Sequence, residues 1–179
     1  TQTVDHAGNV GWHTSLALDT AGQPHISYCD NSYPNYNIKY AHFDGTAWLT
    51  ETVDSTEVTG WYTSLALDTA GRPHISYYNG SPDNNLAYAH FDGTTWLTET
   101  VDSAGNVGSA PSLALDAAGR PHISYLKIDS PNTLRYAHFD GTNWLTETVD
   151  SAGDNSGGST SLALDAAGRP HIAYCKAMV

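Results

Sequence analysis

The sequence predicts an all-β protein assembled from four copies of one unit, and three observations carry this prediction. The string Ser-Leu-Ala-Leu-Asp occurs four times, beginning at Ser15, Ser64, Ser112 and Ser161. The spacings between these copies are 49, 48 and 49 residues. Apolar and polar residues alternate within each unit with the period of two that is typical of half-buried strands. Gly or Pro interrupts every window long enough for a helix. Because the unit repeats along the chain, we expect a single repeat domain over residues 1–179.

Four segments of each unit have the pattern of a strand. In the first unit they are residues 15–19, 24–28, 40–43 and 48–53. The first segment places Leu16 and Leu18 on one side and its small and polar residues on the other. The remaining segments are rich in Tyr, Phe, Trp, Thr, Ile and Val, which favour strands over helices.

Short polar segments between the strands predict turns. They are Ala-Gly-Gln-Pro at 21–24, Asp-Gly-Thr at 44–46, and a stretch rich in Asn, Pro and Tyr at 30–37. Asp recurs at the head of two of these turns in successive units, as Asp19, Asp68, Asp116, Asp165, Asp44, Asp92 and Asp140. An Asp at the head of a turn accepts backbone N–H bonds and fixes the hairpin. We therefore expect turn capping here, and no Asp-rich calcium loop is present in the sequence.

Four strands in a unit of about 40–50 residues are typical of one blade of a β-propeller. The unit SLALDxxGxPHISY followed by YAHFDGTxWLTETVD resembles the blade repeats of bacterial secreted β-propellers over essentially the whole chain. Its DxxGxP and FDGTxW turns are similar to the Asp-box turns of sialidase-type propellers. The resemblance implies a β-propeller-type array of about four four-stranded blades and a secreted, extracellular protein. It implies no particular activity, because propellers include hydrolases, lectins and scaffolds.

The order of the strands predicts that the last blade is incomplete. By analogy with other propellers, Ser-Leu-Ala-Leu-Asp is the innermost strand of a blade and Leu-Thr-Glu-Thr-Val-Asp the outermost. The chain then begins with an outer strand at 2–5, and only residues 175–179 follow the second strand of the fourth unit. Unpaired strand edges at both ends favour self-association. Three outcomes are open: a small four-bladed ring, a larger ring completed by two chains, or a head-to-tail filament.

Composition excludes two classes of partner. Seven Lys and Arg against nineteen Asp and Glu give a formal net charge of −12, with a pI near 4.8. A surface this acidic repels phosphate backbones, so we expect no nucleic acid partner. The sequence has no run of about 18 apolar residues, so we expect no membrane-spanning helix.

Nine His residues suggest a metal or catalytic site, yet most of them repeat from unit to unit. The seven repeated positions are His25, His74, His122, His171, His42, His90 and His138. We expect these imidazoles to be buried and hydrogen-bonded between blades. A zinc site needs three or four ligands at about 2 Å from the ion, which side chains separated by a whole blade do not supply away from the central axis. The sequence thus predicts no metal and no cofactor.

No motif for nucleophilic catalysis or phosphate binding is present in the sequence, which lacks G-x-S-x-G, P-loop, H-E-x-x-H and C-x-x-C patterns. Ser and His lie two residues apart on one strand face, as in His25 and Ser27, but this pair occurs in several units. A catalytic device is rarely built into each copy of a repeat. We therefore predict that the protein is not an enzyme.

The candidate ligand site lies where the units differ. The loop between the second and third strands shares a rim with the connections between blades, and on that rim the first two units are aromatic and polar. The candidate residues are Trp12, His13, Asp30, Tyr33, Tyr36, Trp61 and Tyr62. The later units have Ser109-Ala110 and Ser159-Thr160 in place of the Trp pairs. Aromatic rings stack on the apolar face of a sugar, while amides and carboxylates bind its hydroxyl groups. The alternative, in which Trp12 and Trp61 only pack between blades, stays open.

Three functions follow, in order of preference. The first is a non-catalytic extracellular module that binds carbohydrate, or another small ligand, through the aromatic rim. The second is a structural protein that self-assembles into a ring or filament by strand complementation of its incomplete blade. The third is a glycoside hydrolase, whose paired carboxylates would come from the acids that do not repeat: Asp30, Glu57, Asp83, Asp129 and Asp154.

Overall fold

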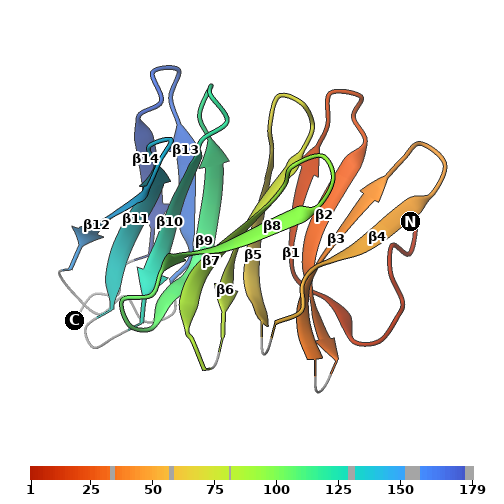
Figure 1. Ribbon diagram of the computed structural model, residues 1–179, viewed down its shortest axis with the longest axis horizontal. Helices are drawn as coiled ribbons and strands as arrows, with labels where there is room; N and C mark the ends of the chain where they lie inside the picture. Colours follow the sequence, from red (N-terminus) through yellow and green to blue (C-terminus); the bar gives the residue numbers. More distant parts are fainter. Residues whose placement is uncertain (33–34, 57–58, 81, 129–131, 152–157, 176–179) are drawn as a thin grey trace.

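The structure, a computed structural model, describes residues 1–32, 35–56, 59–80, 82–128, 132–151 and 158–175. All regular elements within these ranges are β-strands. No helix long and apolar enough to cross a membrane occurs among these residues. The strands form four antiparallel sheets that stand side by side (Figure 1). Three sheets have four strands and the last has two, which confirms the predicted propeller-type array with an incomplete last blade.

Each sheet is a meander in which the strands pair in chain order. The first sheet contains β1 (Val10–Leu18), β2 (Pro24–Ser32), β3 (Asn35–Phe43) and β4 (Trp48–Asp54). The second contains β5 (Thr59–Leu67), β6 (Pro73–Asn79), β7 (Asn85–Phe91) and β8 (Trp96–Asp102). The third contains β9 (Val107–Leu115), β10 (Pro121–Lys127), β11 (Thr133–Phe139) and β12 (Trp144–Asp150). The fourth contains β13 (Thr160–Leu164) and β14 (Pro170–Tyr174).

The innermost strands extend further toward the rim than predicted. Strand β1 begins at Val10, so Trp12 and His13 lie inside a strand and not in a connection between blades. The register of β1 against β2 shifts on either side of Trp12, and φ is +90° at Gly11 and +50° at His13. These irregularities are β-bulges, which add residues to one strand and turn their side chains toward a new direction.

Residues 30–32 and 35–37 are also more regular than predicted. The partners Asp30 and Asn37, and then Asn31 and Tyr36, continue the pairing of β2 with β3. Turn-forming residue types therefore adopt strand conformation here, because pairing with the neighbouring strand overrides local propensity.

The repeated aspartates cap turns, as predicted. The carboxylate of Asp19 accepts hydrogen bonds of 2.8 Å from the backbone N–H groups of Ala21 and Gln23. That of Asp44 accepts bonds of 2.7 and 2.8 Å from Thr46 and Ala47. Equivalent bonds recur in the later units.

The predicted outer strand at 2–5 does not form a strand in the structure. These residues instead lie against the first sheet, where Trp48 Nε1 donates to Gln2 Oε1 at 3.0 Å and Tyr28 Oη donates to Asp5 Oδ2 at 2.6 Å. Trp96 bonds Glu51 and Tyr77 bonds Asp54 in the same manner between the first two sheets. The segment therefore occupies the place of a preceding outer strand, but it lacks a neighbouring strand with which to form a ladder.

The core consists of layers between neighbouring sheets. One cluster joins Ile38 and Tyr40 of the first sheet to Ile75 and Tyr77 of the second. A second cluster joins the second sheet to Ile123 and its neighbours in the third. Each sheet therefore gains its stability from the sheets beside it, as expected of a repeat array.

A hydrogen bond between innermost strands recurs at each junction between sheets. The backbone N–H of Leu65 donates to Ser15 Oγ, that of Leu113 to Ser64 Oγ and that of Leu162 to Ser112 Oγ, each at 3.0 Å. The three junctions thus share one geometry.

The repeated histidines differ from the prediction in two ways. Nδ1 of His25 bonds the Tyr40 hydroxyl of the same sheet, and not a group of the neighbouring sheet. Nδ1 of His42 is buried with no hydrogen-bond partner among the described residues, and the same holds for His90 and His138. His171 is not buried, because no further sheet of the described part of the chain covers β14.

Candidate functional site

The structure brings four of the predicted site residues together on the rim of the first two sheets. The ring of His13 lies 4.4 Å from that of Tyr62 and 5.8 Å from that of Trp61, measured between centroids. Trp12 is 48% exposed and its Nε1 donates to Asn9 at 3.0 Å. Partial burial lowers the pKa of His13, so this aromatic surface is uncharged at neutral pH.

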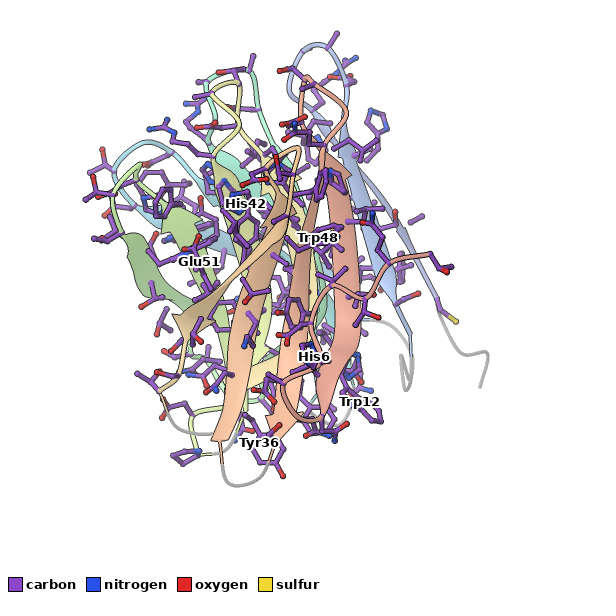
Figure 2. All side chains as sticks on the ribbon, turned by 90° about the vertical axis from the view of Figure 1, so that its right-hand side faces the viewer. His6, Trp12, Tyr36, His42, Trp48 and Glu51 are labelled. Atoms are coloured by element: carbon purple, nitrogen blue, oxygen red, sulfur yellow. The ribbon has the colours of Figure 1, made fainter. Side chains whose placement is uncertain are left out.

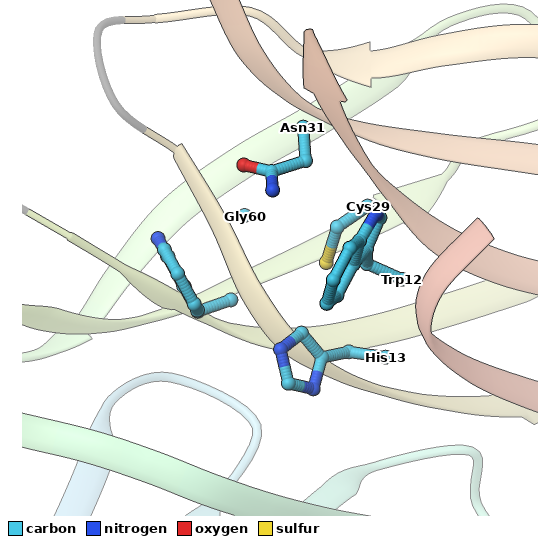
Figure 3. Close-up of a pocket in the computed structure, with 6 residues that line it drawn as sticks. Trp12, His13, Cys29, Asn31 and Gly60 are labelled. Atoms are coloured by element: carbon cyan, nitrogen blue, oxygen red, sulfur yellow. The ribbon is translucent and has the colours of Figure 1, made fainter. Parts of the chain in front are cut away.

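Beneath these rings lies a recess that is too small for a sugar. Figure 3 shows the side chains of Trp12, His13, Cys29 and Asn31 around it, beside the backbone of Gly60. Its volume is about 10 Å³, which is the space of one water molecule. Burial raises the pKa of the Cys29 thiol to about 12, so this sulfur is not an ionised nucleophile. The rim thus offers an exposed aromatic surface without a cavity.

Asp30, another predicted rim residue, does not belong to this exposed aromatic surface. Asp30 is only 9% exposed, and its carboxylate accepts a hydrogen bond of 3.0 Å from the backbone of Ser32. Tyr36 lies at the same end of the first sheet as Trp12 (Figure 2). Tyr33 lies outside the described residues. The Asp30 carboxylate is therefore largely buried, whereas Asn31 lines the recess beneath the rings.

A larger cleft opens between the first and second sheets, away from this rim. Its volume is about 230 Å³. The first sheet contributes His25, Tyr40, His42 and Glu51, and the second contributes Gly71, Arg72, Pro73, Phe91, Gly93 and Trp96. In Figure 2, His42 and Glu51 are well separated from Trp12 and Tyr36. We call this space the inter-sheet cleft.

Aromatic rings form one wall of the inter-sheet cleft. Trp96 meets Tyr40 edge to face, with centroids 5.3 Å apart and planes at 67°. Phe91 lies 5.7 Å from Trp96 on the same sheet. Contacts across both sheets hold the indole in place, so the wall is preorganised for a ligand with an apolar face.

Charged groups flank the aromatic wall. Trp96 Nε1 donates to Glu51 Oε2 at 3.0 Å, which holds the carboxylate at the edge of the indole. Arg72 Nε donates to Asp68 Oδ2 at 2.7 Å, while the Arg72 side chain is 50% exposed. A guanidinium has five N–H donors, so Arg72 retains donors beyond the one that binds Asp68. The inter-sheet cleft therefore combines a carboxylate acceptor and a guanidinium donor.

The back of the inter-sheet cleft is polar but uncharged. Burial is the main cause that lowers the pKa of His25, and it also raises the pKa of Tyr40. The hydrogen bond between these two side chains therefore joins neutral groups at physiological pH. His42 Nδ1, which is buried and unsatisfied among the described residues, adds a hydrogen-bonding atom there.

The same arrangement recurs between the second and third sheets. Tyr88 and Trp144 lie 5.3 Å apart with planes at 70°, and Arg120 pairs with Asp116 at 2.7 Å. Trp144 Nε1 is buried without a hydrogen-bond partner among the described residues, unlike Trp96 Nε1. The aromatic pair and the Arg–Asp pair thus recur at the next junction, whereas the bond from the indole to a glutamate does not recur among the described residues.

Sequence reasoning missed the inter-sheet cleft because its residues repeat. Tyr40, His42, Glu51, Arg72 and Trp96 belong to the repeated strings, in which we predicted only strands, turns and buried histidines. The available signal was that the same Glu, Arg and Trp occur once per junction, which is the spacing expected of a site shared by two neighbouring sheets. Within the described ranges, no group of three His, Cys, Asp or Glu side chains could hold a metal ion.

The sheets and clefts define the chain as a β-propeller-type repeat array. No family model and no curated protein matches it. It is similar to the solved structure of a fucose lectin from Kordia zhangzhouensis in complex with methyl-fucoside. The TM-score is 0.53 and the identity 21%, over 75% of this chain and 96% of that chain.

Two further solved structures have the same kind of fold. A mutant of the Aleuria aurantia lectin in complex with Fucα1-6GlcNAc has a TM-score of 0.55 at 17% identity, over 87% of this chain and 50% of that chain. The xylan β-1,4-xylosidase from Bacillus halodurans has a TM-score of 0.59 at 12% identity, over 93% of this chain and 37% of that chain. The chain thus spans half or less of these two proteins, and at such identities the likeness concerns the fold.

Proposed function

We propose that this protein is a non-catalytic, extracellular carbohydrate-binding module. The observation that carries the proposal is the inter-sheet cleft, in which Trp96, Glu51 and Arg72 line one cavity of about 230 Å³. The indole offers a surface for the apolar C–H face of a sugar ring. The carboxylate accepts hydrogen bonds from hydroxyl groups and the guanidinium donates to ring or hydroxyl oxygens.

The composition of the inter-sheet cleft favours binding over hydrolysis. Among the described residues that line it, Glu51 is the only carboxylate. A retaining glycosidase needs two carboxyl groups about 5–5.5 Å apart, and an inverting one needs them about 6.5–9.5 Å apart. Of the acids considered for a hydrolase, Asp30 is buried beneath the rim, Asp83 is exposed, and Glu57, Asp129 and Asp154 lie outside the described residues.

The solved structures support a carbohydrate ligand by analogy. Two of them are lectins in complex with fucose-containing ligands, and a third is a xylosidase. Secretion is part of the proposal because the repeat resembles those of secreted propellers and because the chain is strongly acidic.

Titration of the purified protein with a panel of monosaccharides, including methyl-fucoside, tests the proposal through tryptophan fluorescence and calorimetry. We expect a saturable response that the double variant Arg72→Ala, Arg120→Ala weakens at least tenfold, about 1.4 kcal/mol. Both side chains are half exposed, so these changes should leave the fold intact.

The aromatic rim supplies the matched comparison. Trp12→Ala and Trp61→Ala remove rings that are 48% and 40% exposed and lie outside the inter-sheet cleft, so binding should survive both changes. Loss of binding in these variants alone would assign the ligand to the rim. No response across the panel would contradict a carbohydrate ligand.

Self-assembly is a second candidate function, because the first and last sheets expose faces that neighbouring sheets cover at every internal junction. Strand complementation, in which residues 2–5 join an incomplete blade, is one form of it. Those residues already lie where an outer strand would lie.

A further inference from the structure

The first sheet exposes an apolar face that the repeat buries everywhere else. Leu16 of β1 is 64% exposed, whereas the equivalent Leu65 and Leu113 are each 7% exposed and Leu162 is 8% exposed. Leu18, on the same side of β1, is 61% exposed. Burial of a leucine side chain is worth about 1.5–3 kcal/mol, so leaving both in water forgoes a large stabilisation. We call this surface, with Ile26 of β2, the head face.

The head face also contains a recess. It has a volume of about 160 Å³ and is lined in part by Val4, Val10, Ile26 and Tyr28. At the next junction the equivalent Ile75 and Tyr77 are covered, since they pack in one cluster with Cys29 and Ile38 of the preceding sheet. The recess is therefore the space that a preceding sheet fills at internal junctions.

The last sheet exposes the complementary face. Ser161 and Ala163 of β13, His171 of β14, and Cys175 are all exposed. Their equivalents in the first sheet contact the second sheet: Ser15 accepts a bond from Leu65, Ala17 and Cys29 pack in the shared cluster, and His25 lines the inter-sheet cleft. We call this surface the tail face.

The two open faces match each other in hydrogen bonding as well as in shape. Each internal junction has a backbone N–H of the following leucine bonded to the Oγ of the preceding serine at 3.0 Å. The head face presents Leu16 at the donor position and the tail face presents Ser161 at the acceptor position. A tail face placed against a head face therefore repeats the internal junction.

One molecule does not bring its own two faces together. The sheet of β1–β4 and the hairpin of β13–β14 lie at opposite ends of the succession of sheets (Figure 1). The exposure of Leu16 and of His171 shows that both faces are uncovered. Within the described part of this chain, nothing therefore covers Leu16 or His171.

We propose that the head face binds the tail face of a second copy of this chain. The inference deepens the self-assembly named as the second candidate function and does not depend on the carbohydrate ligand. The contact is heterologous, so it closes into a ring if the rotation per copy permits and otherwise continues as a filament. Because each copy has a formal charge of −12, added salt should strengthen the association by screening repulsion.

Light scattering on a size-exclusion column, at about 1–100 µM and at low and high salt, tests the proposal. We expect a mass of twice 19.2 kDa or more, increasing with concentration and salt. A mass of 19.2 kDa under all these conditions would overturn the proposal.

Two variants identify the faces. Leu16→Lys places a charge on the head face and Ala163→Arg places one on the tail face, and both sites are exposed, so the fold should be retained. Each variant alone should run at the mass of one chain. Leu97→Lys is the matched control, because Leu97 is 46% exposed on β8 and belongs to neither face, so it should associate like the original protein.

Mixing the two variants gives the decisive result. Leu16→Lys keeps an intact tail face and Ala163→Arg keeps an intact head face, so an equimolar mixture should form a pair that neither forms alone. A mixture that stays monomeric, while the original protein associates, would contradict the head-to-tail contact. Sugar binding by monomeric Leu16→Lys would be unaffected, because the inter-sheet cleft does not contain Leu16.

Discussion

A buried histidine in each complete sheet shows how single residues connect the turns to the core. His74 is 8% exposed, bonds the Tyr88 hydroxyl through Nδ1, and has Nε2 3.8 Å from Asp68 Oδ2. Asp68 in turn caps the turn before β6 and pairs with Arg72. Burial is the main cause that lowers the pKa of His74 to about 4, in spite of the nearby Asp68 carboxylate. The folded protein therefore holds this imidazole neutral.

The stability of the protein should decrease as the pH falls through the window set by His74. Its pKa is about 4 in the folded protein and 6.5 for an unperturbed imidazole, so between these values the unfolded chain binds more protons. The contribution of His74 is thus fully present above pH 6.5 and is lost toward pH 4, on the order of 3 kcal/mol in total. Urea unfolding at pH 7, 6 and 5 measures it, above the range in which most carboxylates titrate.

The control for this pH dependence is the equivalent histidine of the last sheet. His74→Gln should reduce the loss of stability between pH 7 and 5, although His25 and His122, whose pKa values burial also lowers, still contribute to it. His171→Gln, whose side chain is 68% exposed, should leave the profile unchanged. If both changes altered the pH dependence of stability equally, burial of His74 would not be its cause.

At the scale of the element, the bulged starts of β1, β5 and β9 lie close to the contacts between sheets. Gly108 of β9 has φ of +100°, and a Cβ at this position would lie 2.6 Å from Leu86 Cα in the neighbouring sheet. Gly11 of β1 has a similar φ of +90°, yet no atom lies within 4 Å of its would-be Cβ. The two glycines therefore share a backbone requirement and differ only in crowding.

Gly108→Ala should destabilise the protein more than Gly11→Ala. Both changes introduce about 1–2 kcal/mol of backbone strain. Gly108→Ala adds a clash with the backbone of a fully buried residue, for which overpacking typically costs about 1–3 kcal/mol. Chemical denaturation of the two variants measures the difference in their free energy of unfolding. An equal decrease in both would show that the neighbouring sheets can move apart near Gly108 without loss of stability.

At the scale of the whole molecule, each sheet depends for its stability on contacts with the neighbouring sheets. Within the described residues, the second and third sheets have neighbours on both faces, whereas the last sheet has one neighbour and only two strands. Leu162 is the only core residue that β13 and β14 provide within the described part of the chain. The array should therefore open first at β13–β14, since arrays of this kind are governed by contacts between adjacent repeats.

Hydrogen exchange should detect this opening. In solutions dilute enough to keep the chain monomeric, the amides of β13 and β14 should exchange at least tenfold faster than those of β9 and β10. At high concentration the proposed contact between copies should slow exchange in β13, β14 and β1 while leaving β10 unchanged. Uniform exchange across the four sheets would instead indicate a single cooperative unit.

The sequence by itself determined the repeat, the number of strands per unit, the turns capped by Asp44 and its equivalents, and the incomplete last blade. These features depend on the alternation of apolar and polar residues and on turn chemistry. Both act over a few consecutive residues and can therefore be predicted from the sequence alone. It also identified Trp12, His13, Trp61 and Tyr62 as neighbours on one rim, because the phase of the repeat places them there.

Only the tertiary structure decided what the repeated side chains do. It placed Glu51 of one sheet beside Trp96 and Arg72 of the next and so formed the inter-sheet cleft, which the repeated strand and turn patterns did not predict. It also left Leu16 in water while burying Leu65 in an equivalent strand. The physical reason is the same in both cases: the role of a repeated residue depends on which sheet covers it, and that neighbour lies about one repeat away in sequence.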